Sequence, residues 1–303
     1  MVCATKDVAL TQNDLNRLTH WQKDWLLSFN TKDNKCKVLH LGKHNPKHVY
    51  YLDQVQLPET NTEKDLGVLV DSDLNWTQHI QKSISKARSL IGWTCRNVIS
   101  RDKDVLLNIY KNLVRPHLEY CTQLWNPVAK FGKWKIIMDI ERVQREFTRL
   151  IENIGLLPYR QRLNELQLTT LIERRMRGDL IETYKIINGI NNYGNDLYKV
   201  SRSGANLLYN SSLKSYKSDF LPNRVLPYWN KLPTALKFSD SIKKFKVNLE
   251  SYKKLNQKST QGNYWELSNE IFSRINDDNR DSYVNYMLNN PDVMKRRKIT
   301  INV

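Results

Sequence analysis

Hydrophobic positions near the N-terminus recur at spacings of three and four residues, which is the period of an α-helix. They are Leu15, Leu18, Trp21 (or Gln22), Trp25 and Phe29. This pattern predicts an amphipathic helix over residues 11–29. Asn13 and Asp14 come just before most of the stripe and are candidate caps, and residues 30–34 should break the helix.

The pattern changes to short runs of Val, Tyr and Leu between residues 36 and 70. Such runs, bounded by glycine and proline, are typical of strands. We expect strands near residues 38–41, 49–52 and 64–70, with Gly42 ending the first and Pro46 in a loop. A small antiparallel sheet is the simplest arrangement of these strands.

The helical period returns at Trp76 and continues to about residue 190 in four stretches. Pro116 should kink or restart the second helix, and Asn188-Gly189 should end the fourth. Four helices with short links predict an all-α bundle. The apolar stripes are Ile80, Ile84, Ala87, Ile91 and Thr94; Val105, Ile109 and Leu113 with Leu106 and Tyr110; Ile136, Ile140, Val143, Phe147 and Leu150; and Leu171, Met176, Leu180, Tyr184 and Ile187.

Beyond residue 190 the chain alternates between irregular and helical stretches. Residues 191–216 are rich in Asn, Ser and Gly and predict a mobile connection. Ser241 then caps a short amphipathic helix with Ile242, Phe245 and Leu249 on one face. The sequence as a whole predicts an α+β fold in four segments. These are a small antiparallel sheet in 1–75, a helical bundle in 76–190, a basic helical module in 191–260 and a tail in 261–303.

Charge changes this picture, because the net charge of +17, from 48 Lys and Arg against 31 Asp and Glu, is unevenly distributed. Residues 199–258 hold 13 basic and 3 acidic side chains, a net of +10. Such a block suits a polyanion, since neutralised phosphates release counterions; a solvated surface is the alternative. The expected phosphate contacts are Lys243, Lys244, Lys246, Lys253 and Lys254.

Aromatic residues are interleaved with this basic block, as in proteins that stack the bases of single strands or RNA loops. They are Tyr209, Tyr216, Phe220, Tyr228, Trp229, Phe238, Phe245 and Tyr252. Trp229 and Phe245 fall at the spacing of an apolar helix face, which favours a core position for these two.

Other polar groupings do not predict a metal or catalytic site. Gly42 and Pro46 interrupt the series Cys36, His40, His44 and His48, so the spacing of four does not place these side chains on one helix face. Asp65, Asp71 and Asp73 fit a turn and a helix cap better than a metal cluster. Asp277-Asp278 lies in a hydrophilic stretch without the apolar strand of a polymerase site. No nucleotide-binding, zinc-protease or serine-hydrolase motif is present.

Targeting signals are also weak. No run approaches the roughly 18 apolar residues of a membrane span, and the first residues resemble neither a signal peptide nor a transit helix. The four cysteines, at 3, 36, 95 and 121, are spread as reduced thiols would be. We expect an intracellular protein, cytoplasmic or nuclear and not secreted; the basic run KRRK at 295–298 resembles a short nuclear localisation signal.

Several blocks, in order along residues 11–250, resemble the reverse transcriptases of CR1- and Jockey-like LINE (non-LTR) retrotransposons. They include LNRLTHWQKDWLLSFN, KCKVLHLG, EKDLGVLVDSDLNWTQHI, IYKNLVRPHLEYCTQLWNP, ERVQREFTRLI, LPYRQRLNELQLTTLIERRMRGDLIETYKIING and WNKLPTALKFSDSIKKFK. The combination of VRPHLEY, RR-x-RGDL and WN-x-LP is specific to this family's pattern.

The resemblance implies roles for several segments. Residues 1–75 match the end of a polymerase palm, in which Lys35 stands at the motif D lysine and Leu66, Gly67 and Val68 lie in the primer-grip hairpin. Residues 76–190 match the thumb, which closes on an RNA template and a DNA primer. The thumb cations expected to contact nucleic acid are Arg115, Arg174, Arg175 and Arg177. Their alternative role is helix-surface pairing with Glu119, Glu173 and Asp179.

The resemblance also implies what this chain lacks. The family's catalytic aspartates, which hold Mg²⁺ in the full-length enzyme, match nothing here and should lie upstream of residue 1. The chain alone is therefore expected to be inactive as a polymerase and to need no cofactor of its own. Two alternatives to a polymerase fragment remain, a domesticated non-catalytic RNA- or DNA-binding protein and an inert pseudogene product.

Overall fold

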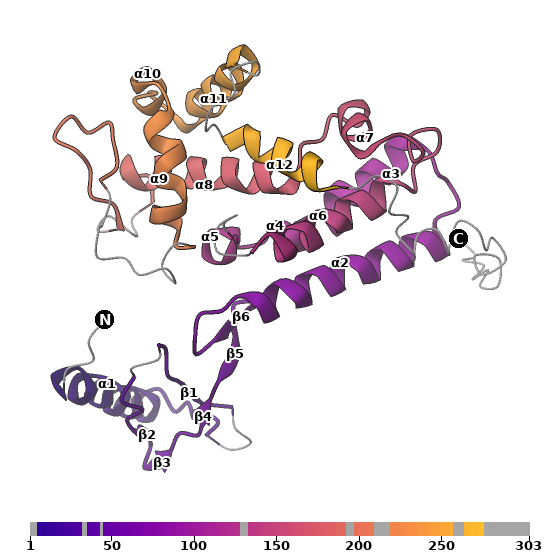
Figure 1. Cartoon of the computed structure of the whole chain (residues 1–303). Coiled ribbons are helices and arrows are strands. Elements are labelled where there is room, and N and C mark those ends of the chain that lie inside the picture. The colour runs from indigo at the N-terminus through magenta and orange to yellow at the C-terminus, as the bar shows by residue number, and fades with distance from the viewer. Residues whose placement is uncertain are drawn as a thin grey trace. The chain divides into compact units, whose positions relative to one another are not determined.

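The computed structural model describes residues 5–31, 35–42, 45–127, 133–191, 197–208, 219–256 and 264–275. The chain forms two compact units, residues 1–79 and 80–303 (Figure 1). Within these described ranges, the first unit holds one helix and six short strands, and the second is helical apart from an isolated bridge between Val200 and Leu207. The predicted α+β class, small sheets with a helical bundle, is confirmed.

The strands of the first unit form three two-stranded sheets. β2 (Tyr51–Leu52) pairs with β3 (Val55–Gln56), and β5 (Thr62–Asp65) pairs with β6 (Val68–Asp71), both antiparallel. β1 (Val38–Leu39) pairs in parallel with β4 (Glu59–Thr60), which no sequence pattern indicates. The strand expected over 64–70 is a hairpin instead, because the chain reverses at residues 66 and 67.

Helix α1 (Thr5–Asp24) begins earlier and ends earlier than the sequence predicts. Asn13 and Asp14 lie inside it, so their prediction as caps is wrong. The helix contacts β2 through Gln12, whose Nε2 donates to the Tyr51 carbonyl (2.9 Å) and whose Oε1 accepts from the Tyr51 amide (3.0 Å). This side-chain amide thus substitutes for a neighbouring strand at the edge of β2.

A polar turn connects β6 to helix α2 (Thr77–Asn97). The Asp71 Oδ1 accepts from the Asp73 amide (3.1 Å) and the Asn75 amide (2.7 Å). The Asn75 Oδ1 in turn accepts from the Thr77 amide (3.3 Å) and hydroxyl (2.7 Å). These bonds confirm the interpretation of Asp71 and Asp73 as turn residues, with Asn75 at the start of α2.

Most of the predicted apolar stripes are buried in the second unit. The stripe of α2, from Ile80 to Thr94, is confirmed. The remaining elements are α3 (Lys103–Ile109), a π-helical turn (Tyr110–Val114), α4 (Pro116–Glu119), α5 (Thr122–Trp125), α6 (Trp134–Thr148), α7 (Tyr159–Glu165), α8 (Leu171–Ile187), α9 (Leu221–Lys231), α10 (Thr234–Lys237), α11 (Ile242–Asn256), a 3₁₀ turn (Tyr264–Glu266) and α12 (Leu267–Arg274).

The expected second helix is interrupted before Pro116. The Arg115 amide donates to the Tyr110 carbonyl (2.8 Å), five residues back, in the π-helical turn. A proline lacks an amide donor and crowds the preceding turn, which this wider turn accommodates. The buried face is Leu106, Tyr110, Val114 and Leu118. Val105 and Leu113, which the sequence placed on that face, are exposed.

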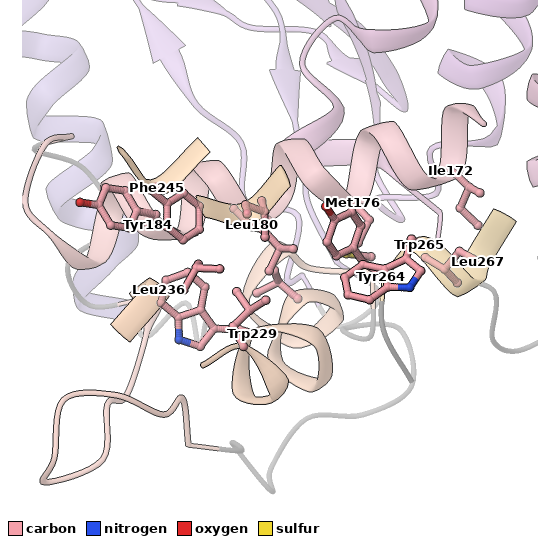
Figure 2. Close-up of a cluster of buried hydrophobic side chains, with 14 of the residues drawn as sticks. Ile172, Met176, Leu180, Tyr184, Trp229, Leu236, Phe245, Tyr264, Trp265 and Leu267 are labelled. Carbon is pink, nitrogen blue, oxygen red and sulfur yellow. The ribbon is translucent and has the colours of Figure 1, made fainter. Parts of the chain in front are cut away.

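The core of the second unit surrounds α8 (Figure 2). The ring of Phe245 stacks on Tyr184 with centroids 4.3 Å apart and lies 6.1 Å from Trp229. Phe245 and Trp229 are 0% and 2% exposed, which confirms the core interpretation for both. Because Tyr264 and Ile271 are buried in the same cluster, this core joins residues from three of the four expected segments.

Two expectations concern stretches that the structure describes only in part. Of the connection predicted over 191–216, residues 191 and 197–208 are described, and Tyr198, Ala205 and Leu207 are buried there. Asp277-Asp278 and the basic run at 295–298 lie outside the described residues. Within the described ranges, no helix has the length and apolar character that a membrane crossing requires.

Candidate nucleic-acid interface

Three of the four expected thumb arginines face carboxylates. The Arg115 Nε lies 3.7 Å from Glu119, and Arg174 also pairs with Glu119. The Arg177 Nε lies 3.6 Å from Glu250. These pairs are partly exposed and stabilise little. They correspond to the alternative role of helix-surface pairing, although Glu250 is a partner that the sequence did not indicate.

Arg175 lies apart from the surface, at 2% exposure. Its Nε donates to Asn126 Oδ1 (2.9 Å), and its two terminal nitrogens have no hydrogen-bond partner among the described residues. Burial lowers the pKa of Arg175, although the nearby carboxylates of Glu141, Glu119 and Asp179 act in the opposite direction. Because Arg175 is buried, a phosphate bound at the protein surface cannot contact its guanidinium group.

A buried ion pair next to Arg175 was not foreseen from the sequence. Arg224 and Asp179 are both fully buried, with Nε and Nη2 of the arginine 2.7 and 2.8 Å from the carboxylate oxygens. Nη2 also donates to the Thr122 and Gln123 carbonyls, and Asn126 Nδ2 donates to Asp179 (2.9 Å). The pair therefore joins α5, α8 and α9, and its role is structural.

The five lysines predicted to contact phosphates all lie on α11, and they fall into two groups. Lys243, Lys246 and Lys254 are exposed and have no hydrogen bond or ion pair with any described residue. Lys244 pairs with Asp240 at the surface. Lys253 is 12% exposed and pairs with Glu173, which also accepts from the Ser268 hydroxyl (2.7 Å). Three lysines of the predicted cluster are thus free to meet a phosphate.

A second set of free cations lies on α2, which contains no acidic residue. Lys82, Lys86 and Arg96 are exposed, without a hydrogen bond or ion pair to any residue in the described ranges. At 100° per residue they share one face with Trp93, which is 45% exposed. The remaining basic residue, Arg88, turns to α6, where its Nε and Nη2 contact Glu146 at 3.0 and 2.8 Å. This stripe extends over roughly 21 Å.

The α2 stripe was missed because we weighed net charge over a long window. Its signal is local: 21 residues with four basic and no acidic side chains, and basic residues at positions i, i+4 and i+14. The same face holds serine and asparagine rather than large apolar side chains, apart from Trp93.

The hairpin expected to resemble a primer grip has a strained two-residue loop. Leu66 (φ 43°) and Gly67 (φ 91°) both have positive φ, as in a type I′ turn, between the paired residues Asp65 and Val68. Leu66 is 84% exposed, whereas Val68 is 3% exposed. A leucine in this conformation is unfavourable, because its Cβ lies close to the following carbonyl oxygen. Lys35 lies exposed just before β1 in the same unit.

Replacing Leu66 with asparagine should stabilise this hairpin by about 1 kcal/mol, because asparagine tolerates the left-handed conformation. We expect roughly fivefold slower hydrogen exchange of the paired amides of β5 and β6. Leu66→Ala serves as the matched control, since it removes the exposed side chain and keeps the conformational cost. Equal exchange rates in the two variants would contradict the role assigned to the loop conformation.

Among the described residues no metal cluster is found, and two of the aromatics interleaved with the basic block are exposed. No three His, Cys, Asp or Glu side chains gather closely enough to hold a metal ion in the described ranges, and His44 lies outside them. Of the interleaved aromatics, Phe220 and Phe238 are exposed, at 49% and 53%. Tyr209 and Tyr216 lie outside the described residues.

The fold and the exposed cations define an α+β chain whose helical unit carries two basic helix faces. In sequence the chain is similar to the probable RNA-directed DNA polymerase from transposon X-element of Drosophila melanogaster, at 28% identity over 138 residues. The match covers 45% of this chain and 15% of the relative. No protein-family model and no solved structure matches the chain. The chain therefore shows a distant, partial similarity to a non-LTR retrotransposon reverse transcriptase.

Proposed function

We propose that the chain is part of a retrotransposon RNA-directed DNA polymerase and that its helical unit binds an RNA template paired with a DNA primer. The observation that carries the binding proposal is the acid-free face of α2, on which Lys82, Lys86 and Arg96 are exposed and pair with no residue that the structure describes. The similarity to a transposon polymerase supports the choice of nucleic acid as the polyanion.

The chemistry of this face suits a nucleic-acid backbone. Three cations along roughly 21 Å of a rigid helix can neutralise successive phosphates and release their counterions. Trp93, between Lys86 and Arg96, offers a flat apolar surface for a sugar or a base. The proposal concerns binding and assigns no bond-making step to the chain. Mg²⁺ would belong to the catalytic aspartates of the full-length family enzyme, and Lys35 is at most an accessory to that site.

The test is a salt titration of binding to a short RNA/DNA hybrid, with Lys82→Ala/Lys86→Ala/Arg96→Ala beside the wild type. Losing three phosphate contacts should flatten the slope of log K against log salt by about 3 and weaken binding roughly 100-fold at 0.1 M salt. The matched control is Lys243→Ala/Lys246→Ala/Lys254→Ala, which removes the same charge from α11. Both sets are exposed, so the helical signal and melting midpoint should stay unchanged.

If the α2 variant binds the hybrid with the wild-type slope, α2 is not the interface. If both triple variants lose the same slope, net charge and not the α2 face governs binding. A domesticated RNA- or DNA-binding protein would give the same result as a polymerase fragment, because both would use this face. An inert pseudogene product would bind the hybrid weakly in all three forms.

A further inference from the structure

The two basic faces of the helical unit lie on opposite sides of it. α2 meets α6 through Arg88 and Glu146, α6 packs on α8, and α8 packs on α11. Figure 1 shows α11 on one side of α8 and α2 on the other. The apolar stripe of each helix points inward, so the two sets of free cations point away from each other. A single straight nucleic acid cannot lie along both.

Helix α11 is held firmly enough to present a defined surface. Its own residues Phe245 and Leu249 are fully buried on the face that packs into the core. At its C-terminal half, Lys253 pairs with Glu173 and Glu250 pairs with Arg177, and both partners belong to α8. These two contacts fix the rotation of α11 on α8. They also neutralise the inward cation of the helix, whereas Lys243, Lys246 and Lys254 pair with no described residue.

The outward face of α11 differs in composition from that of α2. Lys243, Val247 and Lys254 follow one line along roughly 16 Å of the helix, with Lys246 on its flank. Val247 and Leu255 are 58% and 84% exposed, and Phe238, just before the helix, is 53% exposed. Exposed apolar groups between cations can pack against unpaired bases, which a duplex conceals inside its stack.

We infer that α11 forms a second nucleic-acid site, which takes a single strand and is separate from the site on α2. The phosphates contact Lys243, Lys246 and Lys254, and the bases pack on Val247, Leu255 and Phe238. One helical unit can then hold a single strand and a duplex at the same time. Simultaneous binding rests on the proposed function of α2, whereas single-strand binding to α11 does not.

The first measurement is binding of an unstructured single-stranded RNA to the full chain across salt. Lys243→Ala/Lys246→Ala/Lys254→Ala should flatten the salt slope by about 2, while Lys82→Ala/Lys86→Ala/Arg96→Ala should leave it unchanged. Val247→Ser with Leu255→Ser, which keeps the charge, should weaken binding severalfold at constant slope. Binding lost equally in both triple variants would overturn the inference, as would a slope unaffected by the α11 changes.

The second measurement asks whether one chain holds both ligands. Protein on an immobilised RNA/DNA hybrid should capture a labelled single-stranded RNA, and the α11 variant should stay on the hybrid but capture none. If hybrid-bound wild type fails to capture the RNA although the free protein binds it, the two ligands compete for one surface and the inference is overturned. If no form binds the hybrid, the proposal for α2 fails and the single-strand titration still decides the one for α11. Wild-type binding to vesicles of phosphatidylserine, with none to RNA, would assign α11 to membranes instead.

Discussion

Replacing Asp179 with alanine should lower the free energy of unfolding of the chain by about 3–5 kcal/mol, because the change leaves the charge of Arg224 buried without a partner. Both side chains are fully buried, and each oxygen of the carboxylate accepts from the guanidinium group. Asn126 would lose an acceptor as well. The loss should be felt in α5, α8 and α9 together, since Arg224 also holds the carbonyls of residues 122 and 123.

Urea unfolding followed by tryptophan fluorescence measures this loss. The matched control is Asp139→Ala, which breaks the partly exposed pair of Asp139 with Arg142 (3.1 Å) and should cost less than about 1 kcal/mol. The double change Asp179→Leu/Arg224→Met removes both charges and should recover much of the stability. A cost for Asp179→Ala no larger than that of the control would show that the buried pair does not hold these helices together.

The second large effect is a fall in stability as the pH rises, which Glu141 should cause. Glu141 is 1% exposed and accepts from the Tyr159 hydroxyl (2.5 Å) and the Leu171 amide (2.8 Å) at the start of α8. Burial raises the pKa of Glu141 from 4.5 to about 7, although the Tyr159 hydrogen bond and the charge of Arg175 act against it. The native state therefore keeps a proton that the unfolded chain releases near its ordinary pKa.

The sign of the effect follows from proton binding. Between about pH 4.5 and 7 the native state binds more protons than the unfolded state, so the free energy of unfolding falls as pH rises through this window. The full contribution is present below pH 4.5 and is lost above about pH 7. The loss should be on the order of 3 kcal/mol.

Glu141→Gln isolates this contribution, because glutamine keeps the shape of the side chain and an acceptor for the Leu171 amide but does not titrate. Unfolding in urea at pH 5, 6, 7 and 8 should show the wild type losing stability relative to the variant over this range. Taking the difference between the two proteins cancels the other titrating groups. Parallel curves for the two proteins would mean that Glu141 has the same pKa in both states.

Periodic features of the fold could be predicted from the sequence, because they depend on neighbours three or four residues apart. The apolar stripe of α8 and its end at Asn188-Gly189 are found as expected, with Asn188 as the C-cap and Gly189 at φ 63°. The helix capped by Ser241 is likewise present, and the Ser241 hydroxyl accepts from the Lys244 amide (3.2 Å). The turn at Asp71 could be predicted for the same reason, because its hydrogen bonds join residues close in the sequence.

Pairings between distant residues could not be predicted in this way. Lys253 lies in a stretch of lysines without nearby acids, yet its partner Glu173 is 80 residues earlier. Asp179 and Arg224 are 45 residues apart, and each in isolation is typical of a surface position. Local acid content therefore overstated the free charge on α11, whereas net charge taken over a long window understated that on α2.

The single core around α8 has a consequence for how this gene region can change by mutation. Tyr264 and Ile271 are buried with residues that precede them by almost a hundred positions, such as Met176 and Tyr184. A premature stop or a frameshift between codons 188 and 264 would expose the buried face of α8 as well as shorten the protein. The basic face of α2 is therefore presented on a folded unit only while the reading frame stays open for some 170 more codons. Mutations at the 3′ end of this region would unfold the whole helical unit, including α2.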